Sequence, residues 1–416
     1  MNRILFVALL LFSVHVFGQD VTLQQCYSSI NNKHPKAGEK VIFDKVLQSK
    51  VNILKKNLLP QLDMDVKASY QSEVVSLPFT IPNQNIPELD KDQYKATINV
   101  SQVIYDGGLT KLSIEKEKAY AEIEQQRVEV SLYNVKIMAS QFFFSALLLQ
   151  QQKEVLNNIL KKIETKKQQL KAAVEEGAVL SAELNILYVE IIKLKQQIKQ
   201  LENNRQASID VLSQLTGEEY SGKTNFVLPQ SNIQEGSGFV NRPEIILLNS
   251  RYNHLLSLKK ISESKNNPKV FAFASAGYGK PGINMLSNSF NDFYLAGIGL
   301  TWKLWDWHQA KEEVKVLDLN ADIIQKEKEN LHKNFDIKLI QINTEIKNLE
   351  QLIADDDKII TLQKEIVEVY SAKLNNGTIT MSEYIDRVNE EKQAELNFKL
   401  HTLKLVKAKT DYNMNL

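Results

Sequence analysis

The sequence predicts a mixed α and β membrane protein, in which long antiparallel coiled-coil helices alternate with pairs of short strands. Three observations predict this class. The chain contains an internal tandem repeat, four short segments alternate apolar with polar residues, and two proline-free stretches carry apolar residues at seven-residue spacing. Strict alternation is typical of strands, and seven-residue spacing is typical of paired helices.

The repeat is marked by prolines, aspartates and glycines that recur in the same order. The pairs are Pro35 and Pro243, Pro60 and Pro268, Asp106 and Asp306, and Gly177 and Gly377. The offset falls from 208 to 200 residues within the strand region, which places an eight-residue difference in a surface loop. The predicted divisions are a signal peptide (1–18), a first repeat (19–216), a linker (217–240) and a second repeat (241–416). A unit this long exceeds a solenoid repeat, so each copy should be half of one architecture.

The N-terminus predicts export from the cytoplasm. Arg3 precedes an apolar run over residues 4–17 that ends at Gly18, a pattern typical of a secretory signal peptide. Cleavage there removes one of the 51 basic residues, so the mature chain has equal numbers of basic and acidic residues, 50 of each, and no formal net charge. A neutral chain does not favour a nucleic-acid partner. The single cysteine, Cys26, cannot form an intrachain disulfide, and the residues before it lack the small side chains of a lipoprotein cleavage site.

In each copy, the sequence predicts an amphipathic helix and then two strands, which are joined by a polar loop. The apolar positions of these strands are Leu62, Met64, Val66, Ala68 and Tyr70; Tyr94, Ala96, Ile98 and Val100; Val270, Ala272, Ala274, Ala276 and Tyr278; and Tyr294, Ala296, Ile298, Leu300, Trp302 and Leu304. Strands of this length span a bilayer when they are tilted. The nearest approach to an uninterrupted apolar helix is only eight residues, 142–149, so a membrane segment would have to be made of strands.

Two very long helices follow the strand pairs, from about residue 109 to 174 and from about 308 to 374. Both stretches are rich in strong helix formers, and each would be about 100 Å long. Their seven-residue series are Phe142, Leu149, Leu156, Ile163 and Leu170, and Leu339, Ile346, Ile353, Ile360, Val367 and Leu374. Each helix ends at a glycine, Gly177 or Gly377, after which a second helix returns as an antiparallel hairpin.

Two motifs that suggest nucleotide binding are rejected from their context. Residues 217–224 read GEEYSGKT, like a phosphate-binding loop, but a helix precedes them, two glutamates would repel phosphate and Pro229 follows too soon for a helix. Residues 277–282 read GYGKPG, like a dinucleotide fingerprint, but no helix follows. The six histidines lack metal-ligand spacing. We therefore predict no catalytic, cofactor or metal site, and no enzymatic activity.

In this order of elements, the chain resembles the TolC-like outer-membrane efflux proteins, or outer membrane factors. The resemblance covers residues 21–412. Its markers are Val21-Thr22-Leu23 with His34-Pro35, Asn241-Arg242-Pro243-Glu244, Leu59-Pro60, Tyr105-Asp106-Gly107-Gly108 and Leu374-Asn375-Asn376-Gly377-Thr378.

The resemblance implies a homotrimer in the outer membrane of a Gram-negative bacterium. Three sets of four transmembrane strands would form one shared 12-stranded barrel, and the helices would form an α-barrel across the periplasm. The residues require something similar, because four strands cannot close a barrel and open edges are not tolerated in lipid.

The implied function is that of an exit duct, the channel of a tripartite efflux or type I secretion system. Substrates would pass through it passively, with a periplasmic adaptor (membrane fusion) protein and an inner-membrane transporter as partners. A periplasmic coiled-coil scaffold or adhesion protein without a pore is the alternative. The cargo stays open among drugs, metal ions, dyes and proteins.

The resemblance also implies sites at the hairpins. Residues at the tips would contact the adaptor, namely Gly177, Ala178, Val179, Gly377, Thr378 and Ile379. Just beyond the second tip, Glu383, Asp386 and Glu390 share one helix face and would form acidic rings at a periplasmic gate, or else a solvated face in which Glu383 pairs with Arg387. The best-known relatives have a tyrosine before the turn glycine and an arginine just after it, where this chain has Leu374 and Ile379.

The strand faces predict where lipid and lumen lie. The lipid-facing residues are Met64, Val66, Ile98, Val100, Ala274, Ile298 and Leu300. The pore-lining residues are Asp63, Asp65, Lys67, Ser69, Lys95, Thr97, Asn99 and Ser101. At the strand-to-helix junctions lie Tyr105, Trp302, Trp305 and Trp307, which indicate either a girdle at the membrane interface or packing of the junction.

Overall fold

The computed structural model describes residues 20–75, 90–230, 232–233 and 241–415. The predicted signal peptide and most of the first interstrand loop lie outside these residues. The described chain forms two compact units: a first unit of residues 20–39, 128–245 and 330–415, and a second unit of residues 40–127 and 246–329. Each unit contains segments of both predicted repeats.

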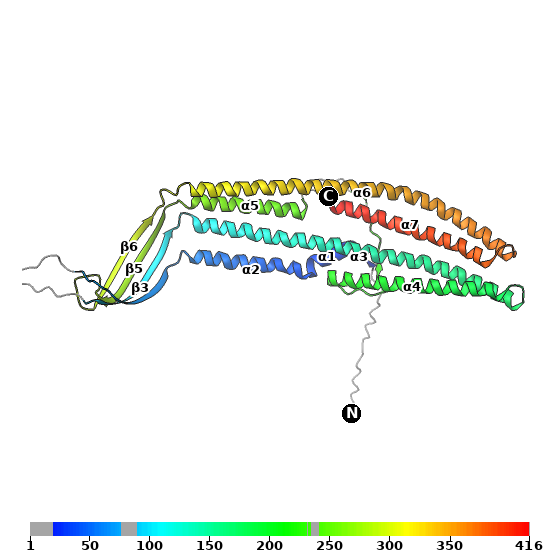
Figure 1. The fold of residues 1–416 in the computed structure, drawn as a ribbon, viewed down its shortest axis with the longest axis horizontal. Coiled ribbons are helices and arrows are strands. Elements are labelled where there is room, and N and C mark those ends of the chain that lie inside the picture. Colours follow the sequence, from blue (N-terminus) through cyan, green and yellow to red (C-terminus); the bar gives the residue numbers. More distant parts are fainter. Residues whose placement is uncertain (1–19, 76–89, 231, 234–240, 416) are drawn as a thin grey trace, which may run out of the picture. The chain divides into compact units, whose positions relative to one another are not determined.

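The second unit contains a four-stranded antiparallel sheet (Figure 1). Its strands are β2 (Gln61–Tyr70), β3 (Asp92–Tyr105), β5 (Lys269–Lys280) and β6 (Asn291–Thr301), in the order β2-β3-β5-β6. The first repeat therefore meets the second at the β3 and β5 pair, where Ile98 lies opposite Ala276. Helix α2 (Pro35–Lys56) leads into β2, and α5 (Pro243–Ser264) leads into β5.

The last strand is shorter than its sequence pattern predicts. Trp302 and Leu304 continue the alternation, but β6 ends at Thr301, where it pairs with Lys269, the first residue of β5. Pro268 precedes Lys269 and has no N–H to extend the ladder, so the partner strand ends there. The two residues lie in the connection to the next helix.

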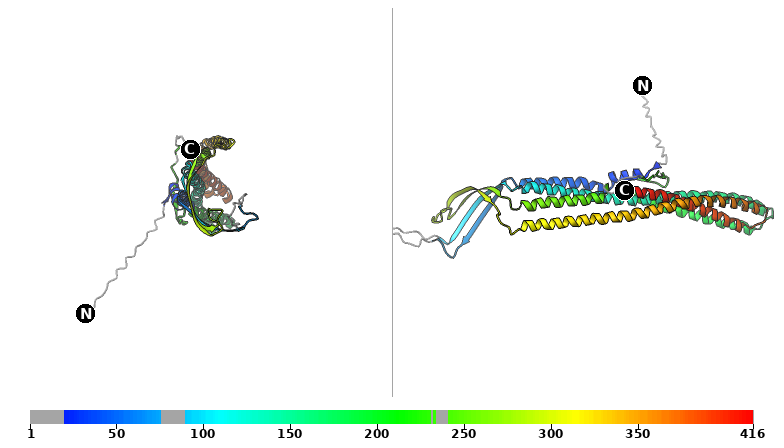
Figure 2. Two further views of the ribbon diagram at one scale, coloured as in Figure 1. Left: turned by 90° about the vertical axis from the view of Figure 1, so that its left-hand side faces the viewer. Right: turned by 90° about the horizontal axis from the view of Figure 1, so that it is seen from above.

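In the strands β5 and β6, one face of the sheet is more exposed than the other, whereas β2 is exposed on both faces. In β5, Ala274, Ala276 and Tyr278 are exposed, while the alternate residues Phe271 and Phe273 are half-buried. The strands form an arc in the end-on view of Figure 2. Side chains on the concave side of an arc shield one another, so the half-buried face is the concave one.

The hairpins of the first unit are made by four helices (Figure 1). They are α3 (Leu109–Glu175), α4 (Ser181–Thr216), α6 (Gln309–Asn375) and α7 (Met381–Asn415), of which α3 and α6 begin in the second unit. Both long helices agree with prediction to within one residue at each end. Every predicted heptad position is buried or half-buried, and a core of Leu156 and Ile163, Leu187 and Leu194, Val367 and Val388 joins the four helices. Coiled-coil pairing is confirmed.

The two turn glycines have the same conformation. Gly177 and Gly377 have φ angles of 76° and 71°, in the left-handed region. Beyond each, the N–H of Ala178 or Thr378 donates to the carbonyl five residues earlier, at 2.9 and 3.0 Å. These bonds form the Schellman motif that ends a helix at a left-handed residue.

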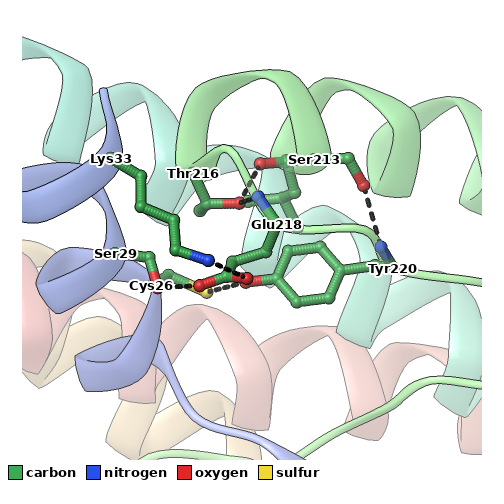
Figure 3. A network of polar contacts seen from close by, with 8 residues as sticks. Cys26, Ser29, Lys33, Ser213, Thr216, Glu218 and Tyr220 are labelled. Atoms are coloured by element: carbon green, nitrogen blue, oxygen red, sulfur yellow. Dashed lines mark hydrogen bonds and ion pairs between the residues drawn. The ribbon is translucent and has the colours of Figure 1, made fainter. Parts of the chain in front are cut away.

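Helix α1 (Leu23–Lys33) packs on the end of α4 through a polar network (Figure 3). Ser29 and Lys33 donate to the Glu218 carboxylate at 2.9 and 2.8 Å. The Cys26 Sγ atom is fully buried 3.8 Å from Tyr220 Oη, and this burial raises the pKa of the thiol to about 11. A short parallel pair, β1 (Asp20–Val21) with β4 (Asn225–Phe226), lies in the same unit and was not predicted.

Among the described helices, α3 has a segment long and apolar enough to cross a membrane, by length and composition only. The sequence prediction considered only uninterrupted apolar runs, and the longest of them, residues 142–149, lies in this helix. A buried core helix passes the same test. Phe143, Phe144 and Leu147 of α3 are all buried within the first unit.

Candidate functional site

The two hairpin tips lie together in the first unit and border a common groove. Its volume is about 400 Å³. Four of the predicted tip residues line it, namely Ala178, Val179, Gly377 and Ile379, together with Lys166, Leu180, Glu183 and Met381. The groove is therefore built by both repeats, with apolar walls and charged side chains at Lys166 and Glu183.

The helices that leave the tips begin differently. Thr380 caps α7: its hydroxyl accepts from the Glu383 N–H at 3.3 Å, and the Glu383 carboxylate accepts from the Thr380 N–H at 2.8 Å. This reciprocal pair is a capping box, which supplies partners for the free N–H groups at a helix start. Leu180, the counterpart of Thr380, has no side chain to cap α4.

The carboxylate of Glu183, the counterpart of Glu383, crosses between the hairpins. It accepts a hydrogen bond from the Met381 N–H at 2.7 Å. Two carboxylates, one from each repeat, thus meet the start of α7. Negative charge is favourable there because of the helix dipole.

In the alternative interpretation Glu383 would pair with Arg387, but the structure shows other partners for both residues. Arg387 donates instead to Glu390, at 2.8 Å, because the backbone N–H at Thr380 already holds the Glu383 carboxylate. The hydrogen bond from that N–H lowers the pKa of Glu383. Glu383, Asp386 and Glu390 are all exposed, so the shared acidic face exists in the chain.

Buried polar contacts join the first hairpin to the second. Lys162 Nζ of α3 lies 2.6 Å from Glu391 Oε2 of α7, whose side chain is 4% exposed. Lys392 Nζ of α7 lies 3.8 Å from Glu190 Oε1 of α4. These contacts lie between helices that also share an apolar core, which includes Ile159, Ile191 and Val388.

Lys166 makes the third link, without a carboxylate among the described residues. Its ammonium donates to Asn375 Oδ1 at 2.6 Å and lies 5.6 Å from the centre of the Tyr384 ring. Burial lowers the pKa of Lys166 because water is excluded from the charge. Lys166 and Asn375 both line the tip groove.

On the sheet, all predicted lipid-facing residues lie on the exposed face. They are Met64, Val66, Ile98, Val100, Ala274, Ile298 and Leu300. On the opposite face the first-repeat strands are polar, with Asn99 donating to Asp65 at 2.6 Å and accepting from Ser275 at 2.6 Å.

The same face of the second-repeat strands is aromatic, which the sequence analysis missed. Phe271 and Phe273 lie on Gly299 and Gly297, where an added Cβ would come within 2.3 and 2.8 Å of the rings. Phe293 lies likewise over Gly277, and Lys95 Nζ sits 4.7 Å from the centre of its ring. The sequence does contain a signal for this face, because β5 and β6 carry phenylalanines and glycines at positions that pair with one another across the two strands.

The loop that reads GEEYSGKT serves a different purpose from phosphate binding. Its Gly222 and Thr224 carbonyls accept hydrogen bonds from the Arg205 guanidinium at 2.8 and 2.6 Å, and Glu218 is held by α1. Strand β4 follows it where a phosphate-binding loop would begin a helix. The GYGKPG segment lies at the end of β5.

A sequence comparison agrees with the resemblance. Residues 45–218 match the family model described as outer membrane efflux protein. This part of the chain is similar to that family, which consists of transport channels rather than enzymes. No curated protein sequence matches the chain.

Solved outer membrane channels share the fold of this chain. The Campylobacter jejuni channel CmeC matches with a TM-score of 0.67 at 14% identity, over 94% of this chain and 85% of CmeC. VceC of Vibrio cholerae matches with a TM-score of 0.66 at 12% identity, over 95% and 94%. MtrE of Neisseria gonorrhoeae, solved in its open state, matches with a TM-score of 0.67 at 14% identity, over 94% and 88%.

The contacts between the two hairpins of this chain were not predicted from the sequence. Lys162 and Glu391 are 229 residues apart, so no local pattern connects them. In the sequence, these contacts were indicated only by the four-residue spacing of Lys162 and Lys166, which puts two lysines on one face of a helix that packs in a core. Among the described residues, no group of three or more His, Cys, Asp or Glu side chains is placed to hold a metal ion.

Proposed function

We propose that this chain is the outer-membrane exit duct of a tripartite efflux or type I secretion system. Substrates pass passively through the lumen of a homotrimer, and an inner-membrane transporter supplies the energy. The observation that carries the proposal is the open sheet: β2 and β6 are edge strands without a further partner among the described residues.

The open edges argue for completion of the sheet by other copies of the chain. Unpaired backbone groups are not tolerated in lipid, so β6 of one subunit would pair with β2 of the next. Two copies would give eight strands and an interior filled by side chains, whereas three give twelve and leave room for a pore. The exposed apolar face then meets lipid, and the concave face surrounds the cargo.

The helices would continue the lumen through the periplasm. Two similar hairpins per chain, from repeats 19–216 and 241–416, would give six hairpins around a trimeric α-barrel. The groove between Ala178 and Ile379 supports contact of the tips with a periplasmic adaptor, because its apolar walls are uncovered at the end of the helices.

The gate would lie beside the tips. The exposed face of Glu383, Asp386 and Glu390 would form acidic rings in a trimer, which attract cations. Because Arg387 binds Glu390, each subunit would contribute less net charge than the three acids alone. The buried link from Lys162 to Glu391 would hold the second hairpin against the first.

Membrane insertion and conductance test the proposal. The full chain, expressed with its signal peptide in a Gram-negative host, should sediment with the outer membrane, run as an SDS-resistant trimer and conduct ions in a planar bilayer. A soluble periplasmic monomer would instead support the scaffold alternative. Deleting the gene and measuring susceptibility to antibiotics, bile salts and metal salts would then identify the class of cargo.

A further inference from the structure

Lys166 is a buried ammonium that has only neutral partners among the described residues. The residue is 8% exposed. Its Nζ atom donates to Asn375 Oδ1 at 2.6 Å and to Ser371 Oγ at 3.4 Å, and the centre of the Tyr384 ring lies 5.6 Å away. An amide oxygen, a hydroxyl and a ring stabilise an ammonium less than a carboxylate does, and a buried charge without a counter-ion is unfavourable. The site therefore favours a negatively charged ligand.

The carboxylates nearby are engaged elsewhere. Lys162, one turn earlier on the same helix, has Glu391 as its partner, with 2.6 Å between Nζ and Oε2. Glu183 shares the tip groove with Lys166, but its carboxylate accepts from the Met381 N–H at 2.7 Å and forms no ion pair with Lys166 in the described part of the chain. The lysine that borders the groove is thus the one without a counter-ion.

The groove has the size and the lining of a site for a small amphiphilic molecule. Its volume is about 400 Å³, and sites for small molecules typically have volumes of roughly 300–1,000 Å³, with mostly apolar walls and a few polar groups. The apolar side chains come from both hairpins, namely Leu170, Val179, Leu180, Leu374, Ile379 and Met381. Part of this wall is uncovered, since Leu180 is 75% exposed.

We propose that the tip groove binds a small amphiphilic carboxylate, such as a medium-chain fatty acid, whose carboxylate pairs with Lys166 and whose hydrocarbon chain lies along the apolar walls. This inference goes beyond the export function and does not depend on it, because the groove lies within one chain. A linear carboxylate suits the site because it can reach an ammonium that is almost fully buried, whereas a protein backbone is too wide to enter.

The ligand would contact both hairpins at once. Lys166 and Leu170 belong to the first hairpin, and Leu374 and Ile379 belong to the second. A bound carboxylate would also favour the charged form of Lys166, and so oppose the burial that lowers the pKa of this lysine. Binding should therefore stabilise the association of the two tips.

Protection of a cysteine in the groove tests the proposal on the purified full-length protein, with octanoate as the probe. Ala178→Cys places a thiol on the groove wall, while the native Cys26 is fully buried and shielded from N-ethylmaleimide. Saturating octanoate should slow the alkylation of residue 178 at least about fivefold, because the bound ligand covers the thiol. Octanol at the same concentration has the same chain without the charge, and it should give clearly weaker protection.

Two lysine variants, made in the Ala178→Cys protein, identify the group that binds the carboxylate. Lys166→Met keeps an unbranched side chain without the charge and should weaken the apparent affinity for octanoate at least about tenfold, since hydrogen bonds to charged groups are strong. Lys171→Met is the matched control, because Lys171 lies on the same helix, is exposed and does not line the groove. It should leave the affinity unchanged. An unreactive Cys26 shows that each variant is folded.

Equal protection by octanoate and octanol, or equal affinity in the Lys166→Met variant, would overturn the carboxylate site. The comparison with octanol uses an unaltered Lys166 and decides the question even if Lys166→Met does not fold. Absence of any protection by octanoate would also overturn the proposal, and contact with the adaptor would then be the only proposed role of the groove. Conductance is measured separately, so a failed carboxylate site leaves the duct intact.

Discussion

Replacing Ile98 with lysine tests which face of the sheet meets lipid. Ile98 is the seventh of the 14 residues of β3, near the middle of the strand, and its side chain is 50% exposed in the isolated chain. A lysine on the lipid face at the bilayer midplane costs about 2–4 kcal/mol. Three subunits would together lose roughly 6–12 kcal/mol. Because whole domains are stable by only about 5–15 kcal/mol, the trimer should largely disappear from the outer membrane.

Thr97→Lys is the matched control, one residue away on the other face. Thr97 lies directly opposite Asp65 of β2, so the new ammonium gains a partner of opposite charge instead of meeting lipid. The assay compares the fraction of SDS-resistant trimer in outer membranes at equal expression. Equal loss in both variants, or a normal yield of Ile98→Lys, would refute the assigned direction of the faces.

Three further predictions concern the helices. Lys162→Met leaves the buried Glu391 carboxylate without its partner and should lower the free energy of unfolding, measured by denaturant titration, by about 3–5 kcal/mol. A second change, Glu391→Leu, should restore most of this loss. A Lys162→Met variant as stable as the original chain would contradict the buried pair. Gly377→Ala places a Cβ at a φ of 71° and should lower the free energy of unfolding by about 1–2 kcal/mol. Gly38→Ala, within α2, is the control and should raise that free energy by roughly 0.5–1 kcal/mol. If thermal unfolding showed Gly377→Ala to be the more stable variant, the assigned turn would be refuted. Burial raises the pKa of the Cys26 thiol from 9.0 to about 11, so at pH 8 the native thiol should react with a maleimide at least about a hundredfold more slowly than the unfolded one. The free energy of unfolding should fall as pH rises above 9.0, because the unfolded chain releases a proton that the native chain retains.

Helix ends and turns were predictable because each depends on a short stretch of sequence. The long helices at 109–175 and 309–375 follow strong helix formers without proline, and they end where Gly177 and Gly377 adopt a conformation that other residues avoid. The end of β6 was not predictable from its own residues. It is set by Pro268, which lies in front of the neighbouring strand.

The interactions at the tips were only partly predictable. The acidic face of α7 follows from helical spacing alone, and the structure retains it. The partner of Glu383 depends on the capping threonine next to the turn, and the partner of Glu391 comes from a helix 229 residues earlier. A spacing of four residues indicates that two side chains on a helix can meet. It does not indicate whether a nearer donor, such as a backbone N–H at the helix start, binds one of them instead.

The marker residues show the same division. Arg242 belongs to a motif that marks the opening of the second repeat, and the sequence assigned it no physical role. In the structure its guanidinium is buried, 3.9 Å from the centre of the Phe335 ring and 5.0 Å from that of Tyr133, and it pairs with Glu244. The motif therefore fixes a packing contact between segments distant in sequence.

The sequence by itself determined the order of the elements, the heptad faces, the glycine turns and the faces of the strands. These features follow from the periodicity of single helices and strands, which any short window contains. The tertiary structure alone decided the pairing across β3 and β5, the buried charges between the hairpins and the phenylalanines lying on glycines. Such contacts join residues from separate elements, and their geometry depends on how those elements pack.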